Sequence, residues 1–353
     1  MWQRLLHRGF LLWLCALLVT ACAVPDPEAQ VKDNPNPPLA ISLNGAGASF
    51  PKFLYDRYFP EFKQETGITV NYEGVGSGAG LRQFLGGTVD FAGSDVLLKP
   101  EQASQIQRGM VAIPTAGGAI AVIYNLEGVK ELKLSRQNLV DIFMGEIQNW
   151  NDSRIAENNP DVQLPDAEIK PVVRADASGT TYTFTNHLAA LSESFKETVG
   201  VSLNPRWKEG FLTARENAGI AQMVLQTPNA IGYVEAVYAI QNKIPTAAIE
   251  NRAGQYVLPE LADTNKAFAE VKFNEDLSAD ISDPSDGYPI IGVTYLLFYG
   301  QYPEPAKAEA VQKLADWIHT KGQEINETLF YTRIPPEIGT KAIAKVKSQV
   351  KMQ

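Results

Sequence analysis

The 353-residue sequence has little thiol or imidazole chemistry. Its only cysteines, Cys15 and Cys22, lie near the N-terminus, so the rest of the chain can form neither disulfides nor thiolate metal sites. Beyond the first residues the histidines are limited to His187 and His319. Such a small set of ligands and bases argues against a metal centre or a histidine-dependent catalytic triad.

The sequence is also poor in positive charge. It has 31 lysines and arginines against 40 aspartates and glutamates, for a net charge of -9. Nucleic-acid-binding proteins usually carry a basic surface, so this class is disfavoured. An anion site in such a protein must depend on local geometry, because the field of the whole molecule repels anions. The length is sufficient for one large domain or two ordinary ones.

The N-terminus has the pattern of an export signal. Arg4 and Arg8 precede an apolar run at 10–19, which is too short to span a membrane with these flanks. Val-Thr-Ala-Cys at 19–22 resembles a bacterial lipobox, in which Cys22 is diacylated after removal of residues 1–21. An ordinary signal peptide with an incidental cysteine is the alternative.

The stretch at 22–40 separates this leader from the body of the chain. Five prolines and no periodic apolar pattern predict an extended tether. We therefore expect an exported protein, in the periplasm or at the outer face of the cell membrane, held there by lipid on Cys22.

From residue 41 onward, strand-like and helix-like segments alternate, which predicts an α/β fold. Helices are expected at 136–144, 181–191 and 306–320. The order of the segments suggests two lobes, with chain crossings near Pro114 and Pro289. Lobe I would comprise 41–115 and 290–353, and lobe II would comprise 116–289.

Three small loops carry hydroxyl groups, and each opens onto a predicted helix. Their sequences are GAGASFP at 45–51, GVGSGAG at 74–80 and RADASGTT at 174–181. A helix N-terminus presents unpaired N–H groups and the positive end of the helix dipole, and glycine lets the backbone approach a ligand. Ser49 is expected to cap its helix, with Pro51 in the first turn. Together the loops predict an anion site.

Each feature also has a simpler interpretation. A serine before a helix is usually only a cap. The second loop fits the dinucleotide pattern G-x-G-x-x-G/A, although an exported protein is a poor host for a free nicotinamide cofactor. Asp95 could face water or cap a helix, and Arg174 could form a surface ion pair with Asp176.

In the order and spacing of these loops the chain resembles the phosphate-binding proteins of the phosphate-specific ABC transporter, the PstS family. The segments that carry the resemblance are GAGASFP, YEGVGSGAG, TVDFAGSD, FMGEIQNWND, VVRADASGTTYTF and AIGYVE. It runs from about residue 43 to the C-terminal helix and is weakest at 247–286 and after 323. The resemblance implies a two-lobed periplasmic-binding-protein fold of type II, with phosphate in the cleft between the lobes.

The resemblance also implies a set of ligand-binding residues, with one carboxylate acceptor among hydroxyl, amide and guanidinium donors. The positions that match are Ser49, Phe50, Ser77, Asp95, Arg174, Ser178, Gly179 and Thr180, with Asp176 holding Arg174. Serine stands at position 49 where the family commonly has threonine. VVRAD has one arginine where the family commonly has VRRAD, so Arg174 is aligned by its spacing to Ser178.

The function implied is capture of inorganic phosphate and its delivery to the permease and ATPase subunits of an ABC transporter. We expect a monomer that needs no cofactor or metal, binds no nucleic acid and is not an enzyme. Asp95 would select phosphate over sulfate by accepting a P–OH hydrogen bond. A phosphate sensor or scavenger, a site for another oxyanion, and a phosphatase with Ser178 as nucleophile are the alternatives.

Overall fold

The computed structural model describes residues 41–281 and 283–352. The expected signal peptide at 1–21, the lipidation site Cys22 and the tether at 22–40 therefore lie outside the described residues. Within the described ranges, no helix combines the length and apolar character needed to cross a membrane.

The central feature is an eight-stranded sheet in the order β2-β1-β3-β13-β4-β8-β6-β7. Helices alternate with most of its strands along the chain, which confirms the predicted α/β class. The strands are β1 (Ser42–Gly47), β2 (Thr69–Gly74), β3 (Phe91–Ser94), β4 (Met110–Tyr124), β6 (Lys170–Arg174), β7 (Leu212–Ala214), β8 (Ala230–Glu235) and β13 (Ile291–Tyr299).

The first half of the sheet ends in a row of glycines. Strands β2, β1 and β3 are parallel, and Gly47 is in register with Gly74 on one side and with Gly93 on the other. The loops that follow these three strands therefore leave the same edge of the sheet. In the second half, β7, β6 and β8 are also parallel, with Arg174 in register with Ala214.

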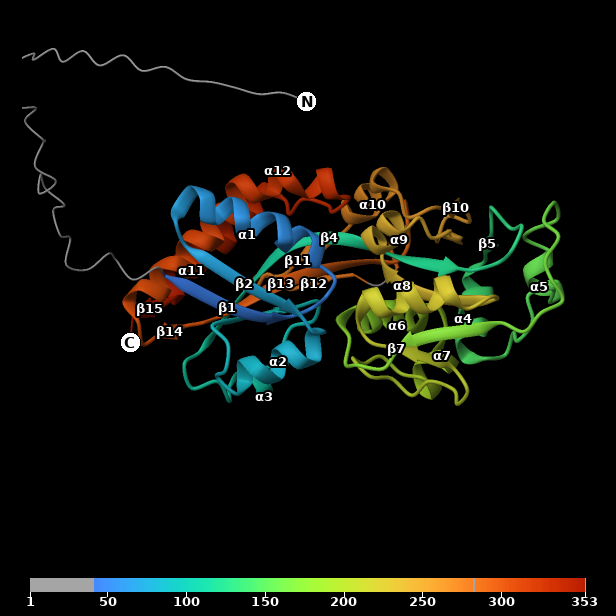
Figure 1. The fold of residues 1–353 in the computed structure, drawn as a ribbon, viewed down its shortest axis with the longest axis horizontal. Helices are drawn as coiled ribbons and strands as arrows, with labels where there is room; N and C mark the ends of the chain where they lie inside the picture. Colours follow the sequence, from blue (N-terminus) through green and yellow to red (C-terminus); the bar gives the residue numbers. More distant parts are fainter. Residues whose placement is uncertain (1–40, 282, 353) are drawn as a thin grey trace, which may run out of the picture. The chain divides into compact units, whose positions relative to one another are not determined.

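Strands β4 and β13 join the two halves and lie side by side in Figure 1. Strand β13 pairs antiparallel with β4 from Met110 to Ala119, and from Ile120 onward β4 pairs with β8 instead. This change of partner lies close to the expected chain crossing. The lobe boundaries near 115 and 290 stay a prediction.

Helices cover both faces of the first half, with α1 and α11 on one side of β1 and β2 and α2 on the other (Figure 1). The larger helices are α1 (Lys52–Thr66), α2 (Ser77–Leu85), α4 (Arg136–Met144), α6 (Gly179–Leu191), α8 (Glu216–Gln226), α9 (Ala236–Asn242), α10 (Leu261–Phe268), α11 (Pro305–Trp317) and α13 (Pro336–Gln349). Shorter ones are α3 (Pro100–Ala103), α5 (Ser153–Ala156), α7 (Glu193–Thr198), α12 (Gln323–Asn326), the π-helix Ile318–Gly322 and the 3-10 turn Glu327–Leu329.

Local sequence explains where several helices begin and end. Helix α4 matches the predicted range, because Ser135 caps its start and Gly145 ends it in the left-handed conformation, with φ 73°. Gly67 ends α1 in the same way. A three-stranded sheet is formed by β10 (Tyr256–Val257), β9 (Ala248–Glu250) and β5 (Lys133–Leu134). Two strand pairs are β11 (Lys272–Phe273) with β12 (Ala279–Asp280), and β14 (Gln301–Tyr302) with β15 (Lys351–Met352).

Candidate functional site

The expected site residues lie just beyond the carboxyl ends of parallel strands from both halves of the sheet. Ser49 follows β1, Ser77 follows β2 and Asp95 follows β3, while Arg174 is the last residue of β6. This edge is where open α/β sheets usually bind ligands. All four side chains are buried.

The first loop corrects one expectation, because Ser49 does not cap helix α1. The helix begins at Lys52 with Pro51 in the cap position, and no side chain accepts its free amides. Residues 49–51 form a turn that delays the helix. The Ser49 hydroxyl oxygen instead accepts a hydrogen bond from the Asn217 side chain, at 3.0 Å.

Two tyrosines from distant parts of the chain hold the backbone of this loop. The Tyr238 hydroxyl donates to the Ser49 carbonyl, and the Tyr331 hydroxyl donates to the Phe50 carbonyl, both at 2.7 Å. Because these carbonyls are fixed, the Ser49–Phe50 turn is held in one orientation.

The second loop packs directly on the third. Ser77 is the first residue of α2, and the Gly78 amide donates to the Ala177 carbonyl at 2.9 Å. Gly76 has φ 88°, and a Cβ there would lie 2.4 Å from a carboxylate oxygen of Asp176. Only glycine tolerates both this backbone angle and this approach. The loop therefore serves to bring two backbones together.

In the third loop, Ser178 has the ordinary role of a helix cap. Its hydroxyl accepts the Thr181 amide at 3.0 Å, and its own amide donates to the Leu203 carbonyl at 2.8 Å. The hydroxyl of Thr180 accepts from the Asn217 side chain at 3.2 Å. The start of α6 thus presents Gly179 and Thr180 toward the first half of the sheet.

Gly179 marks the contact between the two halves. A Cβ at this position would lie 2.5 Å from both the Asp95 carboxylate and the Ser77 hydroxyl. The N-terminus of α6 therefore lies directly beside the acceptor side chain that follows β3. Any side chain at position 179 would force the two halves apart.

Asp95 is buried with only 7% of its surface exposed, so it does not face water. Its amide donates to the Ser77 hydroxyl at 3.3 Å, and its Oδ1 atom has no hydrogen-bond partner among the described residues. Burial raises the pKa of Asp95 to about 7, against smaller opposing effects of Thr294, Arg174 and Ser77. A buried carboxylate with a free oxygen is poised to accept a hydrogen bond from a ligand.

Arg174 and Asp176 form the expected ion pair, but it is buried rather than at the surface. Nε and Nη2 of Arg174 donate to the two carboxylate oxygens of Asp176, at 2.8 and 2.5 Å. Burial favours a raised pKa for Asp176, but the Arg174 hydrogen bonds and charge, together with the Glu216 amide at 3.0 Å, lower it. The edge of the guanidinium that carries Nε and Nη2 is thereby fixed, and its Nη1 atom makes no hydrogen bond to Asp176.

Two buried polar residues at the site were not among the expected ligand-binding residues: Asn217 lies in no quoted motif, and Glu235 ends the segment AIGYVE without a predicted role. Asn217, at the start of α8, contacts both Ser49 and Thr180. Glu235, at the end of β8, accepts the Val237 amide and lies 3.2 Å from the Tyr331 hydroxyl, and burial raises its pKa well above the usual range. Their contacts join residues as many as 168 positions apart, which no local motif could predict.

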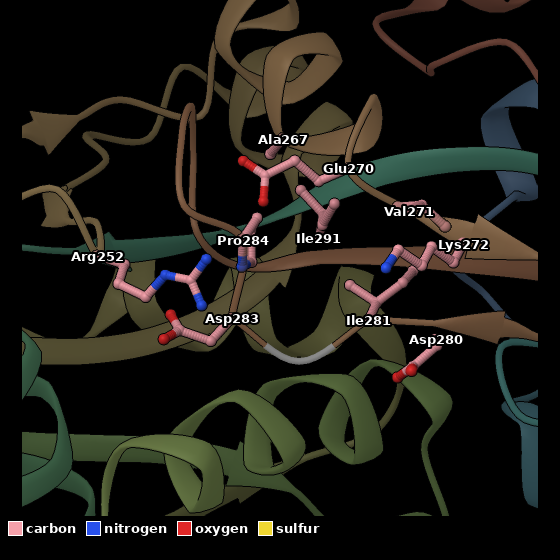
Figure 2. A pocket seen from close by; sticks show the side chains of 10 residues that line it. All are labelled: Arg252, Ala267, Glu270, Val271, Lys272, Asp280, Ile281, Asp283, Pro284 and Ile291. Carbon is pink, nitrogen blue, oxygen red and sulfur yellow. The ribbon is translucent and has the colours of Figure 1, made fainter.

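Figure 2 shows a charged cavity of about 340 Å³. Arg252, Glu270, Lys272, Asp280 and Asp283 point into it or line its rim, so both signs of charge are present. It shares two isoleucines, at 281 and 291, with a smaller cavity of about 60 Å³ that borders Asp95. Its ten lining residues include none of the expected ligand-binding side chains.

Comparison with known proteins agrees with the resemblance seen in the sequence. Residues 26–321 match the family described as the PBP superfamily domain. The phosphate-binding protein PstS of Pasteurella multocida is 34% identical over 318 residues, covering 88% of this chain and 92% of the relative. PstS of Methanocaldococcus jannaschii is 33% identical, covering 96% and 95%. The matched family gives no support to the dinucleotide interpretation of the second loop.

Solved structures show the same two-lobed fold. A high-affinity periplasmic phosphate-binding protein bound with phosphate aligns with a TM-score of 0.74 and 23% identity, covering 86% of this chain and 93% of the neighbour. An ABC-type phosphate transport receptor from Vibrio cholerae aligns with a TM-score of 0.54 and 18% identity, covering 83% and 100%. The predicted periplasmic-binding-protein fold is confirmed.

Proposed function

Since the chain belongs to the PBP superfamily and, within it, to the PstS phosphate-binding proteins, we propose that it captures inorganic phosphate outside the cytoplasm and delivers it to an ABC permease. The observation that carries this proposal is the chemistry of Asp95. Its Oδ1 atom is a buried acceptor without a hydrogen-bond partner among the described residues, and the Asp95 carboxylate lies beside the start of α6.

The donors would come from both halves of the sheet. Hydroxyl groups, backbone amides at the start of α6 and one guanidinium suit a tetrahedral oxyanion with several acceptor atoms. The proposed phosphate-binding residues are Ser49, Phe50, Ser77, Asp95, Arg174, Ser178, Gly179 and Thr180, with Asp176 fixing the arginine.

Asp95 would provide the selectivity. Phosphate keeps at least one proton at neutral pH, so a carboxylate at Asp95 can accept a hydrogen bond from its P–OH group. Sulfate has no such proton and would place lone pairs against the carboxylate. A site built to bond a ligand hydroxyl rejects an analogue without it by about 10⁴- to 10⁵-fold. The raised pKa of Asp95 fits this role, since burial disfavours the charged carboxylate and a hydrogen bond from the P–OH group would stabilise it.

Burial would strengthen every one of these contacts. Ser49, Ser77 and Arg174 have at most 4% of their surface exposed, so an anion held between them would be removed from water. Hydrogen bonds to a charge are stronger in such a low-dielectric setting. Closure of the two lobes over the anion would then be the state that the permease recognises.

We propose that the protein binds phosphate without turning it over. A serine nucleophile needs a base within hydrogen-bond reach, whereas the Ser178 hydroxyl accepts a helix amide. Hydrolysis of a chromogenic phosphate ester that is lost on Ser178→Ala would contradict this assignment.

The lipid anchor and the partners belong to the same proposal. Diacylation of Cys22 would hold the chain at the membrane surface as a monomer, beside the permease and ATPase subunits. A sensor or scavenger would have the same site, so phosphate uptake in a deletion strain distinguishes the roles. Uptake restored by the wild-type chain supports the transport role.

Isothermal titration calorimetry on the anion-free protein tests the binding function. We expect tight binding of phosphate and no measurable heat from sulfate at pH 8, where the Asp95 carboxyl is largely ionised. Tight sulfate binding would remove Asp95 as the basis of selectivity, and absence of phosphate binding would overturn the function itself.

A further inference from the structure

Asn217 is a buried side chain at the site that the proposed function does not yet use. We propose that it is a positioning residue, which turns the hydroxyl groups of Ser49 and Thr180 so that both donate their hydrogens to the bound anion. This inference rests on the proposed function, because it concerns how the same site recognises phosphate.

Both N–H donors of the Asn217 side chain and its acceptor oxygen are engaged in hydrogen bonds. Its Nδ2 atom donates to the Ser49 hydroxyl at 3.0 Å and to the Thr180 hydroxyl at 3.2 Å. Its Oδ1 atom accepts the Glu235 amide at 3.0 Å. A backbone N–H can only donate, so this last bond fixes which end of the amide faces the two hydroxyls.

The consequence for Ser49 follows from the number of hydrogen bonds that a serine hydroxyl can donate and accept. A serine hydroxyl has one hydrogen to donate and two lone pairs. The backbone amide of Asn217 also donates to the Ser49 oxygen, at 3.3 Å, so both lone pairs are occupied. The only capacity left to Ser49 is its O–H donor. At Thr180 one lone pair is occupied in the same way, which favours the orientation in which its hydrogen points elsewhere.

The orientation of these two hydroxyl groups matters because an anion presents mainly hydrogen-bond acceptors. A hydroxyl that turned a lone pair toward it would repel it rather than bind it. Asn217 is fully buried, and Ser49 and Thr180 have at most 4% exposure, so water has little access to reorient them. Asparagine suits this position, because it supplies two donors and one acceptor, whereas aspartate supplies acceptors only.

The contacts of Asn217 also join the two halves of the sheet. Ser49 follows β1 in the first half, whereas Asn217 and Thr180 follow β7 and β6 in the second. The amide can therefore orient both hydroxyls together only when the halves lie as they do here.

Double-mutant cycles on the full chain test this inference, with phosphate affinity measured by calorimetry. We expect Asn217→Ala to weaken phosphate binding about 10- to 100-fold, the effect of losing well-directed hydrogen bonds to a charged group. In the Ser49→Ala and Thr180→Ala backgrounds, the same substitution should cost clearly less, because the hydroxyl that it orients is absent.

Asn159→Ala is the matched control. Asn159 is also a buried asparagine, and its side chain makes three hydrogen bonds to the backbone of Lys133 and Ile155. Its loss should lower the melting temperature but leave phosphate affinity within about twofold, since it lies outside the site.

Asn217→Asp gives a second measurement that does not remove the side chain. The carboxylate can still accept the Glu235 amide but would draw the two hydroxyl hydrogens toward itself, so phosphate affinity should fall further than in Asn217→Ala. Additive losses in both cycles would overturn the positioning role, and so would a wild-type affinity in Asn217→Asp. Failure of the wild-type chain to bind phosphate would instead overturn the proposed function.

Discussion

Two regions of the site each hold a buried aspartate, and the two are prepared in opposite ways. Asp95, after β3, keeps an oxygen without a hydrogen-bond partner among the described residues, and burial raises its pKa to about 7. Asp176, after β6, gives both oxygens to Arg174, and its pKa is lowered. The same side chain is thus left available in one region and fully engaged in the other.

The difference shows how aspartate can have two roles in one site, one in selecting the ligand and one in stabilising a buried arginine. Asp176 stabilises the Arg174 guanidinium, which would otherwise be buried without a counter-charge, so the Asp176 charge is neutralised within the protein. Asp95 forms no such ion pair within the described residues, and Thr294, Arg174 and Ser77 only partly offset the effect of its burial, so its Oδ1 atom stays available to a ligand. Substitution of Asp95 should therefore affect anion selectivity, whereas substitution of Asp176 should mainly affect stability.

The largest effect is expected from Asp95→Asn. The amide can donate to an oxyanion, so sulfate should no longer be rejected, and the phosphate-to-sulfate affinity ratio should fall by at least about 100-fold from its starting value of about 10⁴ or more. Calorimetry with both anions measures the ratio. Asp90→Asn is the control, because Asp90 precedes the same strand and pairs with Lys307 at 2.8 Å, away from the acceptor. An unchanged ratio in Asp95→Asn would show that another group selects the anion.

A smaller loss, mainly of stability, is expected from Asp176→Asn. Removing one partner of a buried ion pair costs about 3–5 kcal/mol, because Arg174 is left without its counter-charge. Selectivity against sulfate should persist. Asp152→Asn is a close match, since Asp152 and Arg154 have the same two-residue spacing and two-point geometry but are more exposed. Chemical denaturation should show a loss of at most about 1 kcal/mol there. Equal losses at both pairs would contradict the burial argument.

The smallest effect is the pH dependence of stability without ligand, which should have opposite signs for the two aspartates. The folded pKa of Asp95 is raised from 3.8 to about 7, so the folded state keeps a proton that the unfolded chain loses, and stability falls as pH rises from about 4 to 7. Asp176 has a lowered pKa, so its contribution is lost only as pH falls below its usual range.

Denaturation of the unliganded protein between pH 3 and 8 measures this difference. The wild type should lose about 2–4 kcal/mol relative to Asp95→Asn between pH 4 and pH 7, since each pKa unit corresponds to about 1.4 kcal/mol. Parallel profiles for the two proteins would show that Asp95 titrates normally.

Much of the fold and the outline of the site could be predicted from sequence, because both depend on local patterns. Helix α4 occupies the expected residues, and the three hydroxyl-bearing loops converge as their order suggested. Their positions follow from parallel strands whose carboxyl ends share one edge.

The parts that could not be predicted depend on contacts between distant segments. Ser49 looked like a helix cap because serine before a helix usually is one, but its hydroxyl is engaged by Asn217, 168 positions away. Tyr238 and Tyr331 have no motif for the same reason, and the segment AIGYVE, which ends at Glu235, did not indicate that residue's contact with Tyr331. Their partners are set by the topology of the sheet rather than by neighbouring residues.

The Tyr238 hydrogen bond has a further consequence for the thermodynamics of binding. In a trans peptide the carbonyl and the following N–H point in opposite directions, so fixing the Ser49 carbonyl also aims the Phe50 amide. The bond links the helix after β8 to the loop after β1, so this amide is aligned by folding and closure rather than by the anion. Conformational entropy that a flexible loop would lose on binding is already lost, so an anion bound at the proposed site would meet a rigid peptide plane.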